Sequence, residues 1–366
     1  SGPAEKCTQV TNLARLNNTA CALYDYDVET GELTDISADA NPADSNGAVA
    51  QGIVDVSKDG STVYFSARGQ LVPGQGPSYT QNLQGEGEAS LYRWHEGRLT
   101  YVGQLSAKDV EANSNQGSLI RYPWHSAAQT DDEGRFLLFV SHVNMFGNNP
   151  QELPQAYFYS AAEESLTCVS CLPAGQAPKT YAEEPVAEVV TTQATGASKA
   201  YSYRPRSLSD DGQVFFNSLE ELAPGAVAGQ ANVYEWYRGQ LSLLTTGRLG
   251  MYGKTLLTKF VGYGGPHARD AFVVSLERLT PQDTDLASDV YDLRSGGGFP
   301  APPPAPPGCE PALGQCQGPG AGAPAPKLSR EAQAAVEADP SDDLFPYLNK
   351  LDGTKIEDTP PGLGHD

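Results

Sequence analysis

The sequence of 366 residues has few methionines, few tryptophans and few cations for its length. It holds 2 Met and 3 Trp against 18 Tyr and 11 Phe, and this aromatic bias favours strands over helices. Lys and Arg number 24 against 45 Asp and Glu, which gives a net charge of -21. Because phosphate binding needs clustered cations, this balance argues against nucleic acid or an anionic membrane as a partner. It is compatible with bound Ca²⁺ or with a cation-rich exterior.

Long apolar runs are also missing. The longest, such as residues 136–140, have the length of a strand, so we expect no transmembrane helix. No signal peptide is visible, and the chain begins at Ser1 rather than Met. We therefore interpret the sequence as a processed or shortened product from which an upstream targeting segment has been lost.

Motifs for catalysis are missing as well. The sequence has no G-x-S-x-G nucleophile elbow, no H-E-x-x-H motif and no Gly-rich phosphate loop in a strand-to-helix setting. His125 and His142 are the histidines best placed to line a central channel, and we interpret both as structural. The sequence therefore predicts no catalytic residue, no cofactor-binding residue and no enzyme activity.

The six cysteines fall in three closely spaced pairs. An even count at short separations in a loop-rich chain favours local disulfides and an oxidising, extracellular compartment. Zinc is the alternative for the middle pair, which has zinc-knuckle spacing, but no second Cys or His pair follows at the usual distance. We predict the disulfides Cys7–Cys21, Cys168–Cys171 and Cys309–Cys316.

One sequence phrase recurs along the first 300 residues. It begins with a polar Asp/Gly turn and a β-branched or aromatic strand, then passes through a Pro/Gly loop to a second strand centred on Tyr. The first three copies continue with a tight turn and one more strand. Apolar and polar residues alternate with a period of two, as is typical of antiparallel strands that face a core. The four copies span residues 56–102, 131–168, 208–244 and 271–292, and a half-copy spans residues 23–36.

Several short strands per repeated unit predict an all-β fold. We expect a β-propeller of four-stranded antiparallel blades, with three complete and two partial blades. A β-sandwich with coincidental turns is the alternative, and four copies in the same internal order argue against it. The N-terminal half-copy could complete the last blade; otherwise closure needs strands from an upstream segment or from another copy. An unclosed propeller would leave sheet edges open to pairing.

The phrase S-x-D-G followed by V-Y-x-W-x-x-G-x-L resembles the WD40-like propeller repeat of the TolB type. The last two copies are similar to a group of secreted bacterial proteins, in which such repeats run into a Gly/Pro-rich tail like residues 296–304. The Cys168–Cys171 pair at the end of a unit is similar as well. The resemblance covers roughly residues 20–305 and implies a propeller and secretion. It is a poor guide to function, because propellers host ligand binding, scaffolding and catalysis alike.

The composition changes sharply after residue 295. We divide the chain into an N-terminal segment (1–19), the propeller repeats (20–295), a Pro/Gly/Ala-rich linker (296–328) and a C-terminal tail (329–366). The tail is predicted to begin with a short helix and to continue with an apolar strip in an acidic context. The strip consists of Leu344, Phe345, Tyr347, Leu348, Leu351 and Ile356.

Carboxylates at alternate positions are the remaining chemical signal. Asp283, Asp285 and Asp289 lie next to the last Tyr strand, and hard oxygen ligands of this kind suit Ca²⁺. A second set lies at residues 25–29, where the alternative is simply a solvated strand face. Neither set has the twelve-residue loop and terminal Glu of an EF-hand. We predict a Ca²⁺ site at Asp283, Asp285 and Asp289.

Together these features predict an extracellular, non-enzymatic propeller that serves as a binding or assembly module. The apolar strip would attach to its own propeller, to another copy or to a cell-surface protein, and a head-to-tail contact would propagate into a ring or filament. Two alternatives stay open. One is a propeller lyase or hydrolase that acts on polysaccharide through carboxylates in the central channel. The other is a small-ligand sensor with a deep apolar pocket.

Overall fold

The computed structural model divides the chain into two units, Ser1–Phe299 and Pro300–Asp366, and every described residue belongs to the first. Two of the predicted disulfides, Cys7–Cys21 and Cys309–Cys316, lie outside the described residues, as do His125 and the apolar strip of residues 344–356. The described residues are 22–41, 43, 47–77, 88–110, 128–147, 149–173, 176–178, 187–188, 206–248, 251–252, 255–285 and 287–294.

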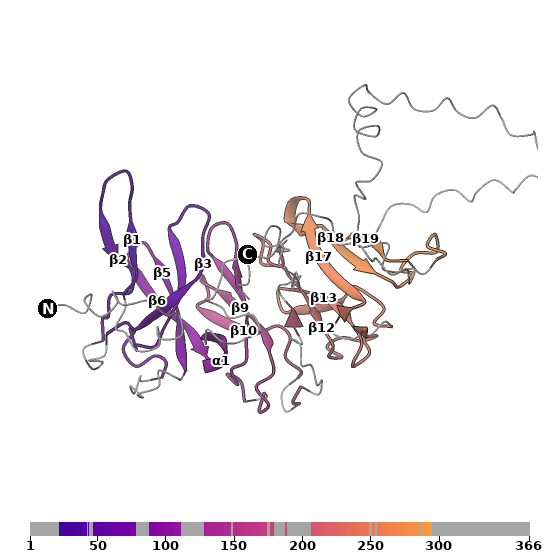
Figure 1. Ribbon diagram of the computed structural model, residues 1–366, viewed down its shortest axis with the longest axis horizontal. Coiled ribbons are helices and arrows are strands. Elements are labelled where there is room, and N and C mark those ends of the chain that lie inside the picture. Colours follow the sequence, from indigo (N-terminus) through magenta and orange to yellow (C-terminus); the bar gives the residue numbers. More distant parts are fainter. Residues whose placement is uncertain are drawn as a thin grey trace, which may run out of the picture. The chain divides into compact units, whose positions relative to one another are not determined.

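Strands dominate the described chain, and they form antiparallel sheets in which neighbours follow chain order (Figure 1). Three sheets have four strands each and are called blades 1 to 3. Blade 1 contains β3 (Ala50–Val56), β4 (Thr62–Ala67), β5 (Ala89–His95) and β6 (Arg98–Leu105). Blade 2 contains β7 (Ala128–Thr130), β8 (Phe136–Ser141), β9 (Gln155–Ser160) and β10 (Ser165–Cys168). Blade 3 contains β11 (Ala187–Glu188), β12 (Val214–Ser218), β13 (Asn232–Tyr237) and β14 (Gln240–Leu243).

The remaining sheets of the described chain are smaller. Blade 4 has three strands, β17 (Thr258–Gly264), β18 (Asp270–Ser275) and β19 (Asp289–Arg294). The N-terminal hairpin consists of β1 (Tyr24–Tyr26) and β2 (Leu33–Asp35), and it pairs with no other described strand. A second two-stranded sheet joins β15 (Met251–Tyr252) to β16 (Thr255–Leu256). Among the described residues, helix is confined to one turn of α1 (Ala107–Val110) and the 3-10 turn η4 (Pro266–Ala268).

Neighbouring blades pack face to face through alternate residues of their strands. In blade 3, Phe216 and Tyr234 belong to the core shared with blades 1 and 2. Phe215 and Val233 face the other way, into the core shared with blade 4. Successive side chains of a strand point to opposite faces, so a blade between two others is apolar on both. The chain is a β-propeller built of four-stranded blades, and the predicted three complete and two partial blades are confirmed.

The tyrosine of the repeated phrase anchors the loop between the second and third strands of each complete blade. Its buried hydroxyl donates a hydrogen bond to a backbone carbonyl of that loop. In blade 3 the same hydroxyl accepts the amide of Leu222, and burial raises the pKa of Tyr234 to about 12. The recurrence of this residue is therefore structural. The donor–acceptor pairs are Tyr92–Gly69, Tyr157–Val143 and Tyr234–Glu220, at 2.7, 2.8 and 2.6 Å.

The polar turns between the first and second strands hold successive blades together. The amide of Lys58 donates to the carbonyl of Asp132 at 2.9 Å, and the amide of Asp132 donates to Oδ1 of Asp210 at 3.1 Å. Arg206 lies 3.0 Å from Asp132 and 3.5 Å from Asp210. The hydrogen bond from Lys58 lowers the pKa of Asp132. Since these ion pairs are well exposed, each contributes less than about 1 kcal/mol to stability. The hydrogen bonds of the backbone amides therefore fix how the turns of neighbouring blades are aligned.

Candidate functional site

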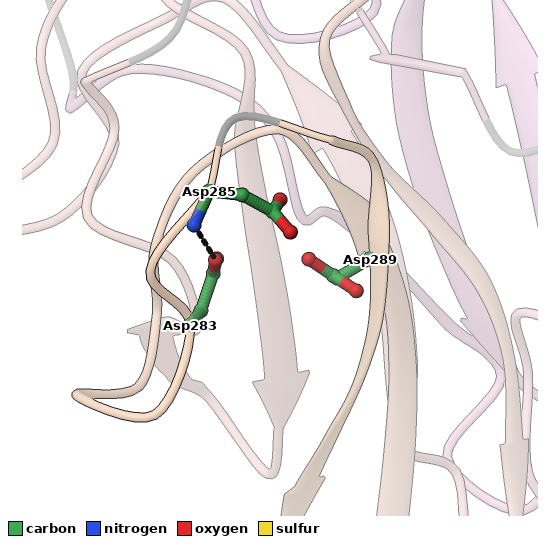
Figure 2. Close-up of side chains that lie close together, drawn as sticks. All are labelled: Asp283, Asp285 and Asp289. Atoms are coloured by element: carbon green, nitrogen blue, oxygen red, sulfur yellow. Dashed lines mark hydrogen bonds between the residues drawn. The ribbon is translucent and has the colours of Figure 1, made fainter.

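The three predicted metal ligands converge in space. Asp283 and Asp285 lie in the loop that follows β18, and Asp289 is the first residue of β19. One carboxylate oxygen from each residue lies within 4.8 Å of the others. In Figure 2 the carboxylates of Asp285 and Asp289 point toward one another, and Asp283 stands beside the backbone of Asp285.

Local hydrogen bonds shape the loop that carries this cluster. Oδ1 of Asp283 accepts the amide of Asp285 at 3.2 Å, and Oδ1 of Asp285 accepts the amide of Ala287 at 2.8 Å. Such side-chain-to-backbone turns are a common property of Asp. Nε of Arg278 donates to the carbonyl of Asp285 at 2.7 Å and closes the loop from the other side. The chain reversal that results brings Asp285 back toward Asp289.

Tyr291 orients the first carboxylate of the cluster. It stands where the anchoring tyrosines stand in blades 1 and 3, but its hydroxyl donates to Oδ2 of Asp283 rather than to a backbone carbonyl. Burial, together with this hydrogen bond and the negative charge of Asp283, raises the pKa of Tyr291 to about 12. The sequence pattern shows the tyrosine, but it does not show that the acceptor is a carboxylate.

The donor set of the cluster suits a hard cation. All three donors are carboxylates, without nitrogen or sulfur, and Ca²⁺ takes six to eight oxygens in a flexible arrangement. Water would have to supply the remaining ligands, because Asp285 is exposed and the other two are half-buried. Mg²⁺ fits less well, since it demands a near-ideal octahedron.

The carboxylates of the N-terminal hairpin behave differently. Oδ1 of Asp27 accepts the amides of Glu29 and Thr30 at 2.8 and 3.0 Å, and these bonds lower the pKa of Asp27. In the described part of the chain, the only group of three or more possible ligands within mutual reach is the one in blade 4. The hairpin set is thus a turn that is stabilised by its own side chain.

His142 belongs to a buried cluster centred on Asp109, a residue that the sequence patterns do not single out. The carboxylate of Asp109 accepts bonds from Oγ of Ser141 at 2.5 Å, from the amide of Ser106 at 2.8 Å and from the amide of His142 at 3.0 Å. Nδ1 of His142 lies 2.8 Å from the same carboxylate. The serine hydroxyl therefore donates to Asp109, so the three side chains are not arranged as a nucleophile and its base.

The other described histidines are engaged in the turns of the blades. Nδ1 of His95 lies 2.9 Å from Oγ1 of Thr62, and Nδ1 of His267 contacts Asp211 in the turn of blade 3. These contacts suit structural roles for both histidines. From the sequence, His142 is interpreted in the same way.

Cys168 and Cys171 form a disulfide bond at the end of β10. The bond closes the outer strand of blade 2, next to the buried Val169. The C-x-x-C pair is thus a disulfide in this structure rather than a pair of zinc ligands.

The outer edge of β19 is open among the described residues. In blades 1 to 3 a fourth strand pairs with the third, whereas the sheet of blade 4 ends at β19. All six residues of β19 pair with β18 along its inner edge. No described strand pairs with the other edge, and an edge of this kind is a template for another extended segment.

Comparison with known proteins finds distantly similar solved structures but no family. No protein-family model and no curated protein matches the chain. Similar solved structures include the β-propeller domain of the Trilobed protease from Pyrococcus furiosus, with 7% identity over 75% of this chain and 64% of that chain, and a TM-score of 0.31. TolB from Acinetobacter baumannii has 11% identity over 77% of this chain and 48% of its own, with a TM-score of 0.29.

A GH74 enzyme from Niastella koreensis is also similar, with 11% identity over 69% of this chain and 37% of its own, and a TM-score of 0.23. This chain spans less than two thirds of each of these three solved chains. Identities and scores of this size carry no argument about activity. No helix among the described residues is long and apolar enough to cross a membrane.

Proposed function

We propose that this chain is an extracellular, non-enzymatic propeller module for binding and assembly. In this proposal the apolar strip of residues 344–356 supplies an extended segment that pairs with the outer edge of β19, in its own copy or in a neighbour. The observation that carries it is that blade 4 has three strands among the described residues, where blades 1 to 3 have four. Strand addition to an open edge gains main-chain hydrogen bonds and places alternate side chains in pockets.

Two further features support this proposal, the first its extracellular setting and the second its non-enzymatic role. The disulfide at Cys168 and Cys171 suits an oxidising compartment. A glycosidase needs two carboxyl groups on opposite sides of a bound sugar. The three carboxylates of blade 4 instead lie on one loop and its adjoining strand, and two of them accept amides of the loop.

Removing residues 300–366 should abolish tail-dependent assembly. We expect the full chain to show a mass that rises with concentration in light scattering, and the shortened chain to remain monomeric. Point variants test the strip without deleting the whole segment, so that a loss of folding is not mistaken for a loss of assembly. The combination Phe345→Ser, Leu348→Ser and Leu351→Ser should have the same effect, while the control Asp342→Ser with Asp343→Ser should not. A full chain that stays monomeric at high concentration would refute pairing with a neighbour and would leave only pairing within one copy.

We further propose that Asp283, Asp285 and Asp289 bind Ca²⁺ beside the open edge. The convergence of three carboxylates within 4.8 Å supports this, since a cation relieves their mutual repulsion. The ion would hold the loop against the start of β19 and leave the edge free to pair.

Calcium should stabilise the propeller weakly and specifically. With few protein ligands we expect a Kd of about 0.1–1 mM, so that 10 mM Ca²⁺ adds about 1.4–2.7 kcal/mol to the free energy of unfolding. Asp285→Asn should weaken binding at least tenfold in calorimetry. The matched control is Glu221→Gln, an exposed residue in the corresponding loop of blade 3. Absence of both heat and a thermal shift with Ca²⁺ in the unaltered chain would refute the site.

A further inference from the structure

The N-terminal hairpin presents an apolar face to solvent. Tyr24, Tyr26 and Leu33 are 52%, 58% and 60% exposed. The register pairs Tyr26 with Leu33, and Tyr24 stands two residues away along β1, so all three lie on one face. We call these three residues the start face.

The equivalent residues of the complete blades are covered by the blade before. Tyr24 corresponds in the repeat to Tyr92 and Tyr234, which are both fully buried. Tyr26 corresponds to Trp236, whose ring lies 4.8 Å from that of Phe158 in blade 2. The start face is therefore the side of a blade that normally packs on a preceding blade, and here no described residue covers it. Leu33 corresponds to Leu99, Leu166 and Leu241, which all pack on buried cores.

Blade 4 presents the opposite kind of face. Phe272 and Val274 are half-buried, and Val290 is 68% exposed. The register pairs Val274 with Val290, and Phe272 lies two residues from Val274 on the same face of β18. We call these three residues the end face.

The equivalent residues of blade 3 are covered by the blade that follows. Phe215 corresponds to Phe272 and is 1% exposed, and Val233 corresponds to Val290 and is 0% exposed. Phe215 stacks on Phe260 of blade 4 at 5.0 Å. The end face is therefore the side that normally meets a following blade. A repeat that needs no neighbour carries a polar outer face, whereas here apolar residues lie beside the charged residues of the same face, which are Asp270, Asp292 and Arg294.

The two faces are the two halves of one repeated contact. An end face is covered in the interior of this chain by the next blade, through its first strand and its tyrosine-bearing strand, and the hairpin offers the part of that side that belongs to the last two strands of a blade. Tyr24 and Val290 are both exposed within one chain, so the two faces do not cover each other there. We propose that the end face of one copy packs on the start face of a second copy, as blade packs on blade.

This contact would make the assembly head-to-tail. It rests on the proposed assembly function, but it uses different residues from the tail strip and names a second copy of this chain as the partner. Because the two surfaces differ, each copy can contact two others, and the result is a closed ring or an open filament. The net charge of -21 makes copies repel one another, so association should strengthen as salt is raised.

Two single variants test the contact. Tyr26→Lys places a charge on the start face, and Val290→Lys places a charge of the same sign on the end face, so the two altered faces repel each other in the mixture. Both sites are exposed, so the fold should persist in circular dichroism. We expect each variant alone to associate at least tenfold more weakly than the unaltered chain in sedimentation velocity. A mixture should form a one-to-one dimer, because each variant keeps the face that the other has lost. Val227→Lys, at an exposed position of blade 3, should leave the assembly unchanged.

The outcomes separate this contact from the tail. If the strip substitutions abolish assembly and the face variants do not, head-to-tail packing is wrong and the tail proposal stands. If the mixed variants still dimerise when both carry the strip substitutions, head-to-tail packing stands without the tail. If Val290→Lys lowers the melting temperature of a monomer without changing its mass, the chain covers its own end face and the inference is overturned.

Discussion

Replacing Asp109 by alanine should lower the free energy of unfolding by about 3–5 kcal/mol. Asp109 is almost fully buried on α1, between the outer strand of blade 1 and the second strand of blade 2. Its carboxylate accepts Ser141 Oγ and two backbone amides and pairs with His142. Truncation leaves these buried donors without an acceptor, and that desolvation cost exceeds the value of the bonds themselves.

Chemical denaturation at neutral pH measures this effect. Asp109→Asn keeps an oxygen acceptor and should cost less than Asp109→Ala. The control is Glu152→Gln, which removes a half-exposed ion pair to Lys108 and should cost less than about 1 kcal/mol. A loss below 1 kcal/mol for Asp109→Ala would show that the cluster does not hold the two blades together.

The effect of the control substitution Glu152→Gln on stability should also depend on pH. The hydrogen bond from Lys108 lowers the pKa of Glu152 below its ordinary value of 4.5. A carboxyl group whose pKa is lower in the folded state than in the unfolded state stabilises the fold. This stabilisation is fully present at pH values above the pKa of the group in the unfolded state. The small difference between Glu152→Gln and the unaltered chain should therefore be complete above pH 4.5 and fade as the pH falls through the lowered pKa.

Replacing Phe215 by alanine should cost about 3–5 kcal/mol and loosen blade 4 from blade 3. The ring is buried at the junction of the two blades and stacks on Phe260 and Tyr263, at 5.0 and 5.9 Å. Removing it leaves a cavity in the smaller core that joins the blades. We expect the unfolding curve to broaden or to split, with blade 4 opening first.

Phe272→Ala is the matched control for this junction. Phe272 occupies the same place in the repeat of blade 4, but no described blade covers it, so its loss should cost only about 1–2 kcal/mol in dilute protein. Hydrogen exchange of β18 and β19 distinguishes the two variants, because only Phe215→Ala should expose both strands together. Equal costs for the two variants would mean that the junction does not hold blade 4 in place.

Local patterns were enough to predict the blades. Period-two alternation, Asp/Gly turns and a recurring tyrosine are properties of short segments, and they indicate which strands close in sequence pair with each other. The incomplete last blade was also visible, because the phrase at 271–292 has no closing strand. The disulfide of Cys168 and Cys171 followed from spacing alone.

The tertiary structure decided the rest, because it depends on contacts between distant segments. Asp109 receives its partners from residues 32 and 33 positions later, which no periodicity reveals. Alternate spacing suggested Asp283 and Asp285 as ligands, but only the reversal of their loop brings Asp289 within 4.8 Å. Most of all, a tyrosine at the same place in the phrase is exposed at position 24 and buried at position 92. Burial is set by which blade lies opposite, and a strand's own sequence does not contain that information.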